Sequence, residues 1–574
     1  MRKLYFAGCV IAAACLGGCT KTNDIEPVSK GVDFFAHVDN VDTKTSINGL
    51  QVLWEKKDSI AIQVTKNHLY NASSPGEYST TYGIYRLTDD AIGKKFGRFT
   101  FAGGNECIEG DEEFFAFYPA SDCRVKNNGY FYVTFPRTQY YEDNCGDKLP
   151  LPMYGIGKNR EVSFEYAGAV LKLRVWAEEE TEIHSCIISA DKLSKDAFTY
   201  VKDGKWQQRL SSAYDVSNLN LKMRKPLKIS TDPSNPTIIP IIIPLAGTTN
   251  LTNLKFAINS TNGGAELKKN SPLKVERGTV VTFPVTKLTI VPDKMYVDEY
   301  EGVIDTAWVK TAKSSVKVTM PSSSLFKNVV FKGIMEATRN LNNKNKKIVL
   351  DLSMAIADTS TLEGLNNNNK YVGFCGGTNR DNGIKNISKF YLPEGITTIL
   401  NRAFAYSDYT EIVLPTTLTK ISGSPSNGCD SLRWKVAEGN KSFKADEKGA
   451  LYDYEMKTLM VLNGGGSVDS YAVKDGTTTI REWALYENSV IKTLTIPASV
   501  TKLSGDCISG TPNLTTIICL GTKPAEFIPN TGKNKVGPAN QTKTLYVPKG
   551  CGKDYEAKWK ALLDEGNWQV VEQN

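Results

Sequence analysis

The sequence predicts a mainly β protein in which two β-sandwich domains precede a solenoid of stacked repeats. Short segments rich in β-branched and aromatic residues fill the first half of the 574-residue chain, and Gly, Asn, Asp and Pro separate them. Such strands without helical patterns between them favour sandwiches. In the second half a Leu-Pro motif recurs at fixed intervals, which indicates repeat units. A chain of this length is too long to fold around one hydrophobic core, which suggests two to four domains.

The N-terminus has the layout of a bacterial signal peptide. Arg2 and Lys3 supply positive charge, and residues 4–16 form an apolar run. That run is too short to cross a hydrocarbon layer of about 30 Å. We expect residues 1–18 to be a signal peptide and residues 19–31 to be a polar tether.

The end of this segment resembles a bacterial lipobox. It reads Leu16-Gly17-Gly18-Cys19. The residues Leu16, Gly17 and Gly18 are expected to be recognised by the signal peptidase, and the Cys19 thiol is the expected site of lipid attachment. Several acyl chains on one cysteine anchor a protein stably, so the resemblance implies an outer-membrane lipoprotein.

The bulk composition excludes several classes of protein. Hydrophobic residues make up 41% of the chain and charged residues 23%, which is ordinary for a globular protein. A net charge of +7 over this length is too dilute to indicate a nucleic-acid partner. The most apolar later run, residues 238–245, is interrupted by Pro240 and Pro244, so it is not a membrane span.

The first half divides into two predicted sandwiches, over residues 32–180 and 181–288, with the boundary somewhere in 178–225. Three landmarks in the first one come in order: Trp54 to Ile60, Phe115 to Pro119, and Phe135 to Tyr140. With the lipobox and a closing strand at 279–285, their order and spacing resemble the fimbrillin-like lipoproteins of Bacteroides-type bacteria. That resemblance implies two transthyretin-like β-sandwiches.

The second half, residues 327–574, carries the repeats. Residues 392–399 recur as 414–421, and residues 473–480 recur as 496–503, at intervals of 22 and 23 residues. This period lies in the leucine-rich-repeat range. Each unit buries its apolar side only by stacking on its neighbours.

These repeats resemble the BspA-like leucine-rich repeats of bacterial surface antigens. The segments 436–452 and 459–462 resemble that family's inserted hairpin, and Leu545 to Gly550 with Tyr555 and Trp559 resembles its closing element. At Ser422 to Asn427 the expected alanine-phenylalanine pair is missing, which predicts a bulging loop.

The ends of the repeat domain are also predicted. Residues 327–353 are expected to form an N-terminal cap, with a helix at Phe331 to Leu341 and a strand at Ile348 to Leu352. Residues 289–326 are read as a linker between the two halves, or as one strand pair at an interface.

No catalytic constellation emerges from the sequence. His37, His68 and His184 lie far apart without metal-ligand spacing, so we expect no metal site and no His-based triad. The acidic runs 111–113 and 178–180 are contiguous, which suits solvated turns better than a glycosidase pair. We therefore predict no enzyme activity and no cofactor.

Aromatic and cysteine residues have plain structural interpretations. Tyr130 to Tyr132 and Tyr140-Tyr141 could stack on sugar, but the core or edge of a sandwich explains them more simply. Cys429 and Cys507 are expected in the core. For the cysteines beyond Cys19, buried free thiols are favoured, with a bridge among the first three left open: Cys107, Cys123, Cys145, Cys186, Cys375, Cys429, Cys507, Cys519 and Cys551.

Three functions fit these features. The first is a non-enzymatic surface adhesin, in which the repeats present a binding face for a host or bacterial surface protein or polysaccharide. The second is a pilus tip or anchor subunit that binds other pilus subunits. The resemblance to fimbrillins implies that a shaft subunit is cut after an arginine near its mature N-terminus. Here the first arginine after Cys19 is Arg86, which argues against a shaft subunit. The third is a carbohydrate-handling lipoprotein. The expected location is the outer membrane with the repeats facing outward, and a periplasmic orientation is the alternative. Ligand-binding residues remain unknown.

Overall fold

The computed structural model describes most of the chain beyond residue 32. The described residues are 33–38, 54–64, 82–104, 113–125, 131–134, 138–141, 152–191, 193, 197–202, 205–210, 218–245, 248–297, 316–321, 325–326, 334, 348–362, 383–464, 469–528, 536–564 and 567–573. Strands dominate this part and helices are few, so the prediction of a mainly β protein is confirmed. Among these residues there is no helix that is both long and apolar enough to cross a membrane.

Seven N-terminal strands close into a barrel. In barrel order they are β1 (Phe34–Val38), β10 (Glu161–Tyr166), β9 (Met153–Lys158), β5 (Phe114–Tyr118), β2 (Ser59–Val64), β3 (Gly83–Leu87) and β4 (Gly97–Gly104). Because β1 pairs in parallel with β10 and antiparallel with β4, the ladder has no open edge. The sequence predicts a sandwich here. The observed ladder is closed instead, because β1 pairs with both β10 and β4, which are far from it in the sequence.

The barrel core is aromatic. Trp54 is 1% exposed, and its ring lies edge-on to Phe99 and Phe164 at centroid distances of 5.0 and 6.1 Å. Two short 3-10 turns, Asp89–Ala91 and Ala120–Asp122, lie between strands. The landmark tryptophan of the sequence is thus a buried member of the first core.

Two further sheets share a second core. One contains β16 (Thr237–Pro244), β11 (Gly168–Trp176) and β20 (Val280–Lys287); the other contains β18 (Gly263–Lys269), β17 (Thr249–Ser260), β12 (Glu182–Asp191), β15 (Asn218–Lys228) and β8 (Thr138–Tyr141), with β19 (Leu273–Val275) on β17. Buried Leu and Ile side chains of both sheets meet between them. Pro240 and Pro244 are accommodated because β16 is an edge strand, where a missing N–H costs little.

A small four-stranded sheet is formed separately from the barrel ladder. Only its backbone is described, and its order is β14 (Lys205–Leu210), β13 (Ala197–Lys202), β7 (Phe131–Thr134) and β6 (Cys123–Val125). Two of its strands, β6 and β7, precede the boundary range 178–225 expected between the first two domains, and the other two, β13 and β14, lie within that range.

The junction between the second core and the repeats is well connected. Strand β21 (Lys294–Tyr296) follows directly, and the Asn259 side chain makes two hydrogen bonds to the backbone of Tyr296, of 2.9 and 2.8 Å. The Tyr296 side chain packs with Ile187 and Ala257 of the preceding sheet. The repeats therefore continue directly from the second core.

The repeat region begins with a parallel sheet that we call the first long sheet. It contains β21, β22 (Val316–Thr319), β24 (Ile348–Asp351), β27 (Ile387–Tyr391), β29 (Glu411–Leu414) and β31 (Arg433–Val436). Shorter strands complete the units: β23 (Leu325–Phe326) with β25 (Ile356–Ala357), and β26 (Thr361–Leu362) with β28 (Thr398–Ile399) and β30 (Lys420–Ile421). Residues 22 apart pair directly, such as Lys389 with Glu411 and Glu411 with Arg433, so the predicted period is confirmed.

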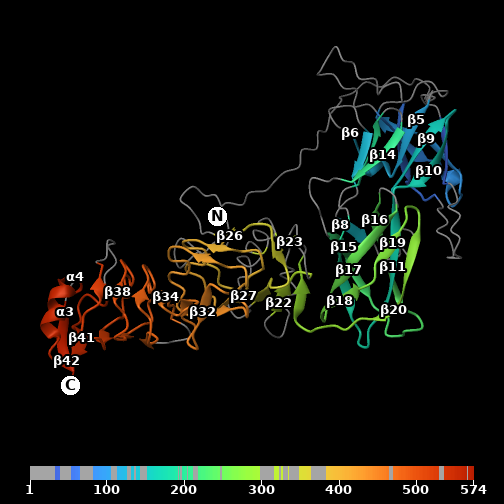
Figure 1. The fold of residues 1–574 in the computed structure, drawn as a ribbon. Coiled ribbons are helices and arrows are strands. Elements are labelled where there is room, and N and C mark those ends of the chain that lie inside the picture. The colour runs from blue at the N-terminus through green and yellow to red at the C-terminus, as the bar shows by residue number, and fades with distance from the viewer. Residues whose placement is uncertain are drawn as a thin grey trace, which may run out of the picture.

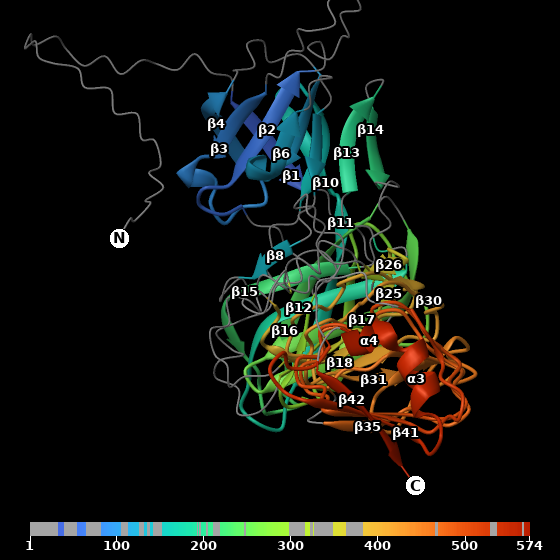
Figure 2. The ribbon, with the colours of Figure 1, turned by 90° about the vertical axis from the view of Figure 1, so that its left-hand side faces the viewer.

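The C-terminal part has a corresponding second long sheet. It contains β35 (Ser470–Ala472), β37 (Thr493–Ile496), β39 (Thr516–Cys519), β41 (Lys543–Pro548) and β42 (Trp568–Gln573). Its companion sheet contains β32 (Phe443–Ala445), β33 (Leu451–Asp453), β34 (Thr458–Val461), β36 (Thr479–Ile480), β38 (Lys502–Leu503) and β40 (Glu526–Phe527). Helices α3 (Gly552–Lys558) and α4 (Lys560–Asp564) follow β41. Figure 1 shows the repeat region extending from the two-sheet region to these helices, and Figure 2 shows the barrel beyond the other end of the two-sheet region.

The hairpin β32–β33 separates two repeat cores. Leu451 and Val461 belong to the core under the first long sheet, whereas Tyr452, Leu459 and Leu462 belong to the core under the second. Neighbouring residues thus face opposite cores, as alternation along a strand requires. The inserted hairpin that the sequence predicts therefore lies between the two repeat cores.

Several local predictions can be compared with the structure. The strand expected at Ile348 to Leu352 is β24, and of the helix expected at 331–341 only Ile334 is described, helical and buried. The bulge expected at Ser422 to Asn427 is wrong. Backbone N–H groups of the 402–406 turn donate to carbonyls of this segment, and its Ser426 is 1% exposed.

Candidate binding surface

The outward face of the first long sheet is charged. Its two columns of side chains run across the strands at the usual spacing of about 4.8 Å. The columns are Lys317, Val349, Lys389, Glu411 and Arg433, beside Asp351, Tyr391, Val413 and Lys435.

Ion pairs join these columns. Lys317 Nζ lies 2.6 Å from Asp351 Oδ2, and Glu411 lies 3.8 Å from Lys389 and 3.4 Å from Lys435. Burial alone would raise the pKa of Asp351, but hydrogen bonds from Lys317 and Ser353 outweigh it and lower that pKa below 3.8. The two acids of this face are therefore already paired.

The outward face of the second long sheet carries no charge in its two columns. One column is hydroxyl and amide, and the other is mostly apolar. They are Ser470, Thr493, Thr516, Thr544 and Gln569, beside Ala472, Thr495, Ile518, Tyr546 and Val571. The residues between them, such as Leu494 and Ile517, are fully buried. This face is therefore neutral and lies over a fully buried layer of side chains.

Threonines connect successive repeats beside the first long sheet and beside the companion sheet of the second half. The Thr410 hydroxyl donates to the Ser388 carbonyl at 3.0 Å, and the Thr501 hydroxyl donates to the Thr478 carbonyl at 3.3 Å. Each bond spans one repeat, so the hydroxyls fix the stacking distance.

A cleft of about 760 Å³ opens where the first long sheet meets the hairpin. Its walls are β31 with Glu411 of β29, the loop 437–442, β32, the turn between β32 and β33, and the turn after β33. Its cations are Arg433, Lys435, Lys441 and Lys444. The volume is within the range of about 300–1,000 Å³ typical of ligand sites.

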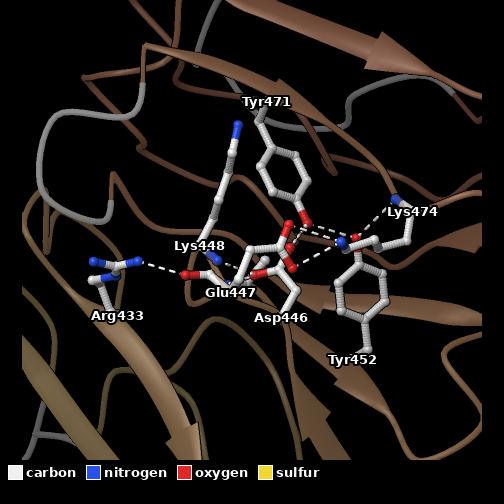
Figure 3. A network of polar contacts seen from close by, with 8 residues as sticks. Arg433, Asp446, Glu447, Lys448, Tyr452, Tyr471 and Lys474 are labelled. Atoms are coloured by element: carbon white, nitrogen blue, oxygen red, sulfur yellow. Dashed lines mark hydrogen bonds and ion pairs between the residues drawn. The ribbon is translucent and has the colours of Figure 1, made fainter.

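A polar network fixes the hairpin turn beside this cleft (Figure 3). The Tyr471 hydroxyl donates to Asp446 Oδ2 at 2.6 Å and lies 2.6 Å from the Tyr452 hydroxyl. Asp446 Oδ1 accepts from the backbone N–H groups of Lys448 and Ala450 at 3.0 and 2.8 Å. The turn is therefore anchored to the second long sheet through Tyr471.

Burial governs the ionisation of these tyrosines. Burial raises the pKa of Tyr452 to about 12 and raises that of Tyr471 further. A hydrogen bond from Lys474 lowers the pKa of the exposed Glu447, whose carboxylate lies 2.8 Å from Lys474 Nζ. The hydroxyls stay protonated and the carboxylate stays charged near neutral pH.

The seam between the two repeat halves is also polar. Arg481 Nη1 donates to the Ile421 carbonyl at 2.8 Å, and its Nη2 donates to the Gly423 carbonyl. The Trp434 indole N–H donates to Asn463 Oδ1 at 2.9 Å. These contacts connect β30 and β31 with the units beyond the hairpin.

The candidate chemical residues of the sequence are largely structural. His37 lies beside Phe96, His184 is half-buried in β12, and His68 lies outside the described residues. Within the described part of the chain no group of three or more His, Cys, Asp or Glu side chains could hold a metal ion. Glu178 and Glu180 pair with Lys287 and Lys228 at the surface.

The cysteine predictions are confirmed where they can be compared. Cys186, Cys429, Cys507, Cys519 and Cys551 are free and buried. Burial raises the pKa of Cys429 and Cys507 to about 12, so neither is an activated nucleophile. The side chains of Cys107, Cys123, Cys145 and Cys375 lie outside the described residues, as do Leu16, Gly17, Gly18 and Cys19.

The aromatic residues that the sequence singles out differ in exposure. Tyr141 is buried, as a core position predicts, whereas Tyr140 is 55% exposed with the Arg224 guanidinium 5.2 Å from its ring centre. The side chains of residues 130–132 are not described. The cleft residues Lys441, Lys444 and Tyr454 were missed, although the hairpin that carries the last two was predicted.

Comparison with protein families identifies the repeats. The model of the BspA type leucine rich repeat region matches six copies, over residues 382–446 and 462–525. These residues form a BspA-type leucine-rich repeat region. The gap between the two matched spans coincides with the turn between β32 and β33, with β33 and with β34. The leucine-rich repeats are therefore interrupted at the inserted hairpin. No curated protein sequence matches the chain.

Solved structures give broader similarities. A protein from Bacteroides ovatus, proposed to act in cell adhesion, is 15% identical over 46% of this chain and 95% of its own, with a TM-score of 0.29. A leucine-rich repeat protein from Eubacterium ventriosum is 18% identical over 50% of this chain and 74% of its own, with a TM-score of 0.27. A protein from Bacteroides uniformis, also proposed to act in cell adhesion, is 12% identical over 45% and 94%, with a TM-score of 0.27.

Proposed function

We propose that the protein is a non-enzymatic surface adhesin, an outer-membrane lipoprotein anchored through acyl chains on Cys19. In this proposal the fimbrillin-like part, read as two transthyretin-like domains, forms a stalk. The leucine-rich repeats form a solenoid that presents the binding surface. Membrane anchoring rests on the lipobox-like sequence, and outward orientation rests on the resemblance to surface antigens.

The observation that carries the proposal is the pair of continuous outward faces. Each long sheet stacks its outward side chains in columns over a fully buried layer, for example Thr493 and Thr495 over Leu494. Such a face is broad and flat, and stacking holds it rigid, which suits recognition of a protein or polymer surface. The free cysteines of the described part are buried, and no group of three or more His, Cys, Asp or Glu side chains there could hold a metal ion.

Adhesion by whole cells tests this proposal. Cells that make the full chain should bind immobilised mucin or extracellular-matrix protein better than cells that lack it. A Thr495→Arg/Thr516→Arg variant, with two charges on the neutral face, should lose that gain. Thr522→Arg/Thr542→Arg, at exposed positions outside the columns, is the control and should keep it. Equal binding with and without the protein on both surfaces would contradict the proposal.

A further inference from the structure

The cleft beside the hairpin has an unequal supply of free charges. Its carboxylates are Glu411, Glu438, Asp446 and Glu447, and three of these already have partners. Glu411 lies between Lys389 and Lys435, and Glu447 pairs with Lys474. Asp446 accepts hydrogen bonds from Tyr471 and from the backbone of its own turn. Two of the pairing lysines, Lys389 and Lys474, lie outside the lining of the cleft.

Three cations in the cleft are not committed to carboxylates. Arg433, Lys441 and Lys444 are exposed, and none of them forms an ion pair with another described residue. Arg433 Nη2 donates to the Glu447 carbonyl at 2.6 Å, which fixes the guanidinium but leaves its charge available. Among the carboxylates of the lining, Glu438 and Asp446 have no ion pair within the described part, and Asp446 is held by hydrogen bonds alone. The lining holds four cations and four carboxylates, and the outside partners Lys389 and Lys474 add two more cations, so the cleft together with these two lysines carries net positive charge.

The arginine position is built into the hairpin. Gly449 has a φ of +82°, and a Cβ at this position would lie 2.5 Å from Arg433 Cβ. A glycine thus lets the turn approach β31 closely and accept the arginine hydrogen bond. Because the Asp446–Tyr471 bond anchors the same turn (Figure 3), the cation is held on a fixed support.

An aromatic ring accompanies these cations. Tyr454 is 39% exposed at the cleft, and Lys444 Nζ lies 4.0 Å from its ring centre. A ring offers an apolar face with a polar hydroxyl at its tip. A carboxylated sugar could pack its apolar ring face near Tyr454 and place its carboxylate on Lys444.

The cleft lacks the apolar pocket that a peptide would need as an anchor. Its largest apolar side chains, Trp434 and Phe443, are only 1% and 4% exposed, and Val436 and Met456 are half-buried and packed against the cores beneath. Protein ligands usually gain most of their affinity from side chains buried in such pockets. The features left at the surface, cations and one ring, fit an acidic sugar better than an acidic peptide.

We infer that this cleft binds a carboxylated polysaccharide through Arg433, Lys441, Lys444 and Tyr454. The inference rests on the proposed function only in assigning ligand binding to the repeat region. The neutral face of the second long sheet is a separate surface, so either one can fail without the other.

Titration of the full mature chain with polygalacturonate tests the inference. Binding is expected, and raised salt should weaken it because opposite charges attract. Neutral dextran and poly-glutamate should bind at least about tenfold more weakly. Equal or tighter binding of poly-glutamate would assign the cleft to acidic peptides and overturn the inference, as would absence of polygalacturonate binding.

Matched variants locate the site. Lys441→Gln/Lys444→Gln should lower affinity by about tenfold, since two attractive charges are lost. Tyr454→Ala should lower it by about threefold while leaving the charge unchanged. Lys502→Gln/Lys523→Gln removes two exposed lysines away from the cleft and should change affinity less than about twofold. Equal losses in both lysine pairs would show general charge attraction and reject the cleft. If these variants behave as expected while the Thr495→Arg/Thr516→Arg cells adhere normally, the cleft stands and the proposed adhesive face fails.

Discussion

The two long sheets of the repeat region share one architecture but present different surfaces. The first exposes Lys317, Asp351, Lys389, Glu411 and Lys435 in paired columns, whereas the second exposes threonines, Ile518 and Tyr546. The stacking that buries Leu and Ile beneath each sheet is the same. Outward positions are thus free to vary while inward positions are fixed by packing.

The hairpin between the sheets makes this difference possible. It ends the first core and begins the second, so each half carries its own surface chemistry. It also brings Lys444 and Tyr454 next to the edge of the first long sheet. One insertion therefore separates two faces and forms the cleft at their border.

The largest expected effect concerns the packing at this border. Trp434→Ala removes a fully buried ring that contacts Phe404 and bonds to Asn463, which should cost about 3–5 kcal/mol of unfolding free energy. Hydrogen exchange should rise more in β27–β31 than in β37–β41. Trp54→Ala, an equally buried tryptophan in the barrel, is the control and should leave exchange in both long sheets unchanged. Equal rises in both sheets after Trp434→Ala would mean that the halves unfold as one unit.

A smaller loss is expected at the polar seam. Arg481→Met leaves the carbonyls of Ile421 and Gly423 without their donor. We expect a cost of about 1.5–3 kcal/mol, since hydrogen bonds from a charged group are lost. Urea denaturation measures it, with Lys502→Met at an exposed site as the control. A loss no larger than that of the control would indicate that the seam does not couple the two halves.

Alkaline pH should lower the stability of the second half of the repeat region. Because the folded pKa of Tyr452 is raised to about 12, its contribution to stability is present below the unfolded value of 10 and is lost between pH 10 and 12. The loss is up to about 1.4 kcal/mol for each pH unit in this window. Tyr452→Phe should lose less stability than the wild type between pH 8 and 11 in thermal melts. Parallel pH profiles would contradict the burial of this hydroxyl.

The smallest expected effect is a loss of stability of the first long sheet at low pH. The lowered pKa of Asp351 means that its contribution is present above the unfolded value of 3.8 and is lost as pH falls through the folded pKa. We expect Asp351→Asn to cost about 0.5 kcal/mol at pH 6, as ion pairs with an exposed lysine do, and to cost less at pH 2. Melting temperatures at both pH values measure this. A difference that stays constant with pH would exclude the Lys317 pair as its cause.

The sequence predicted the repeat region better than the cleft. The spacing of Leu392 and Leu414 gives the 22-residue period because stacking forces equivalent residues into register, and Cys429 follows as a core position. The free charge of the cleft depends on pairs such as Glu447 with Lys474, 27 residues apart. Closure of the barrel depends on the two partners of β1. Such long-range pairings leave no periodic signal in a single sequence.

Protease treatment of intact cells tests the central claim most directly. A non-specific protease is added to producing cells, and the repeat region is followed by blotting alongside a periplasmic control protein. The account predicts that the repeat region disappears while the control survives, because the leucine-rich repeats face outward. Persistence of the repeat region until the outer membrane is broken would contradict the adhesin and place the binding surfaces in the periplasm.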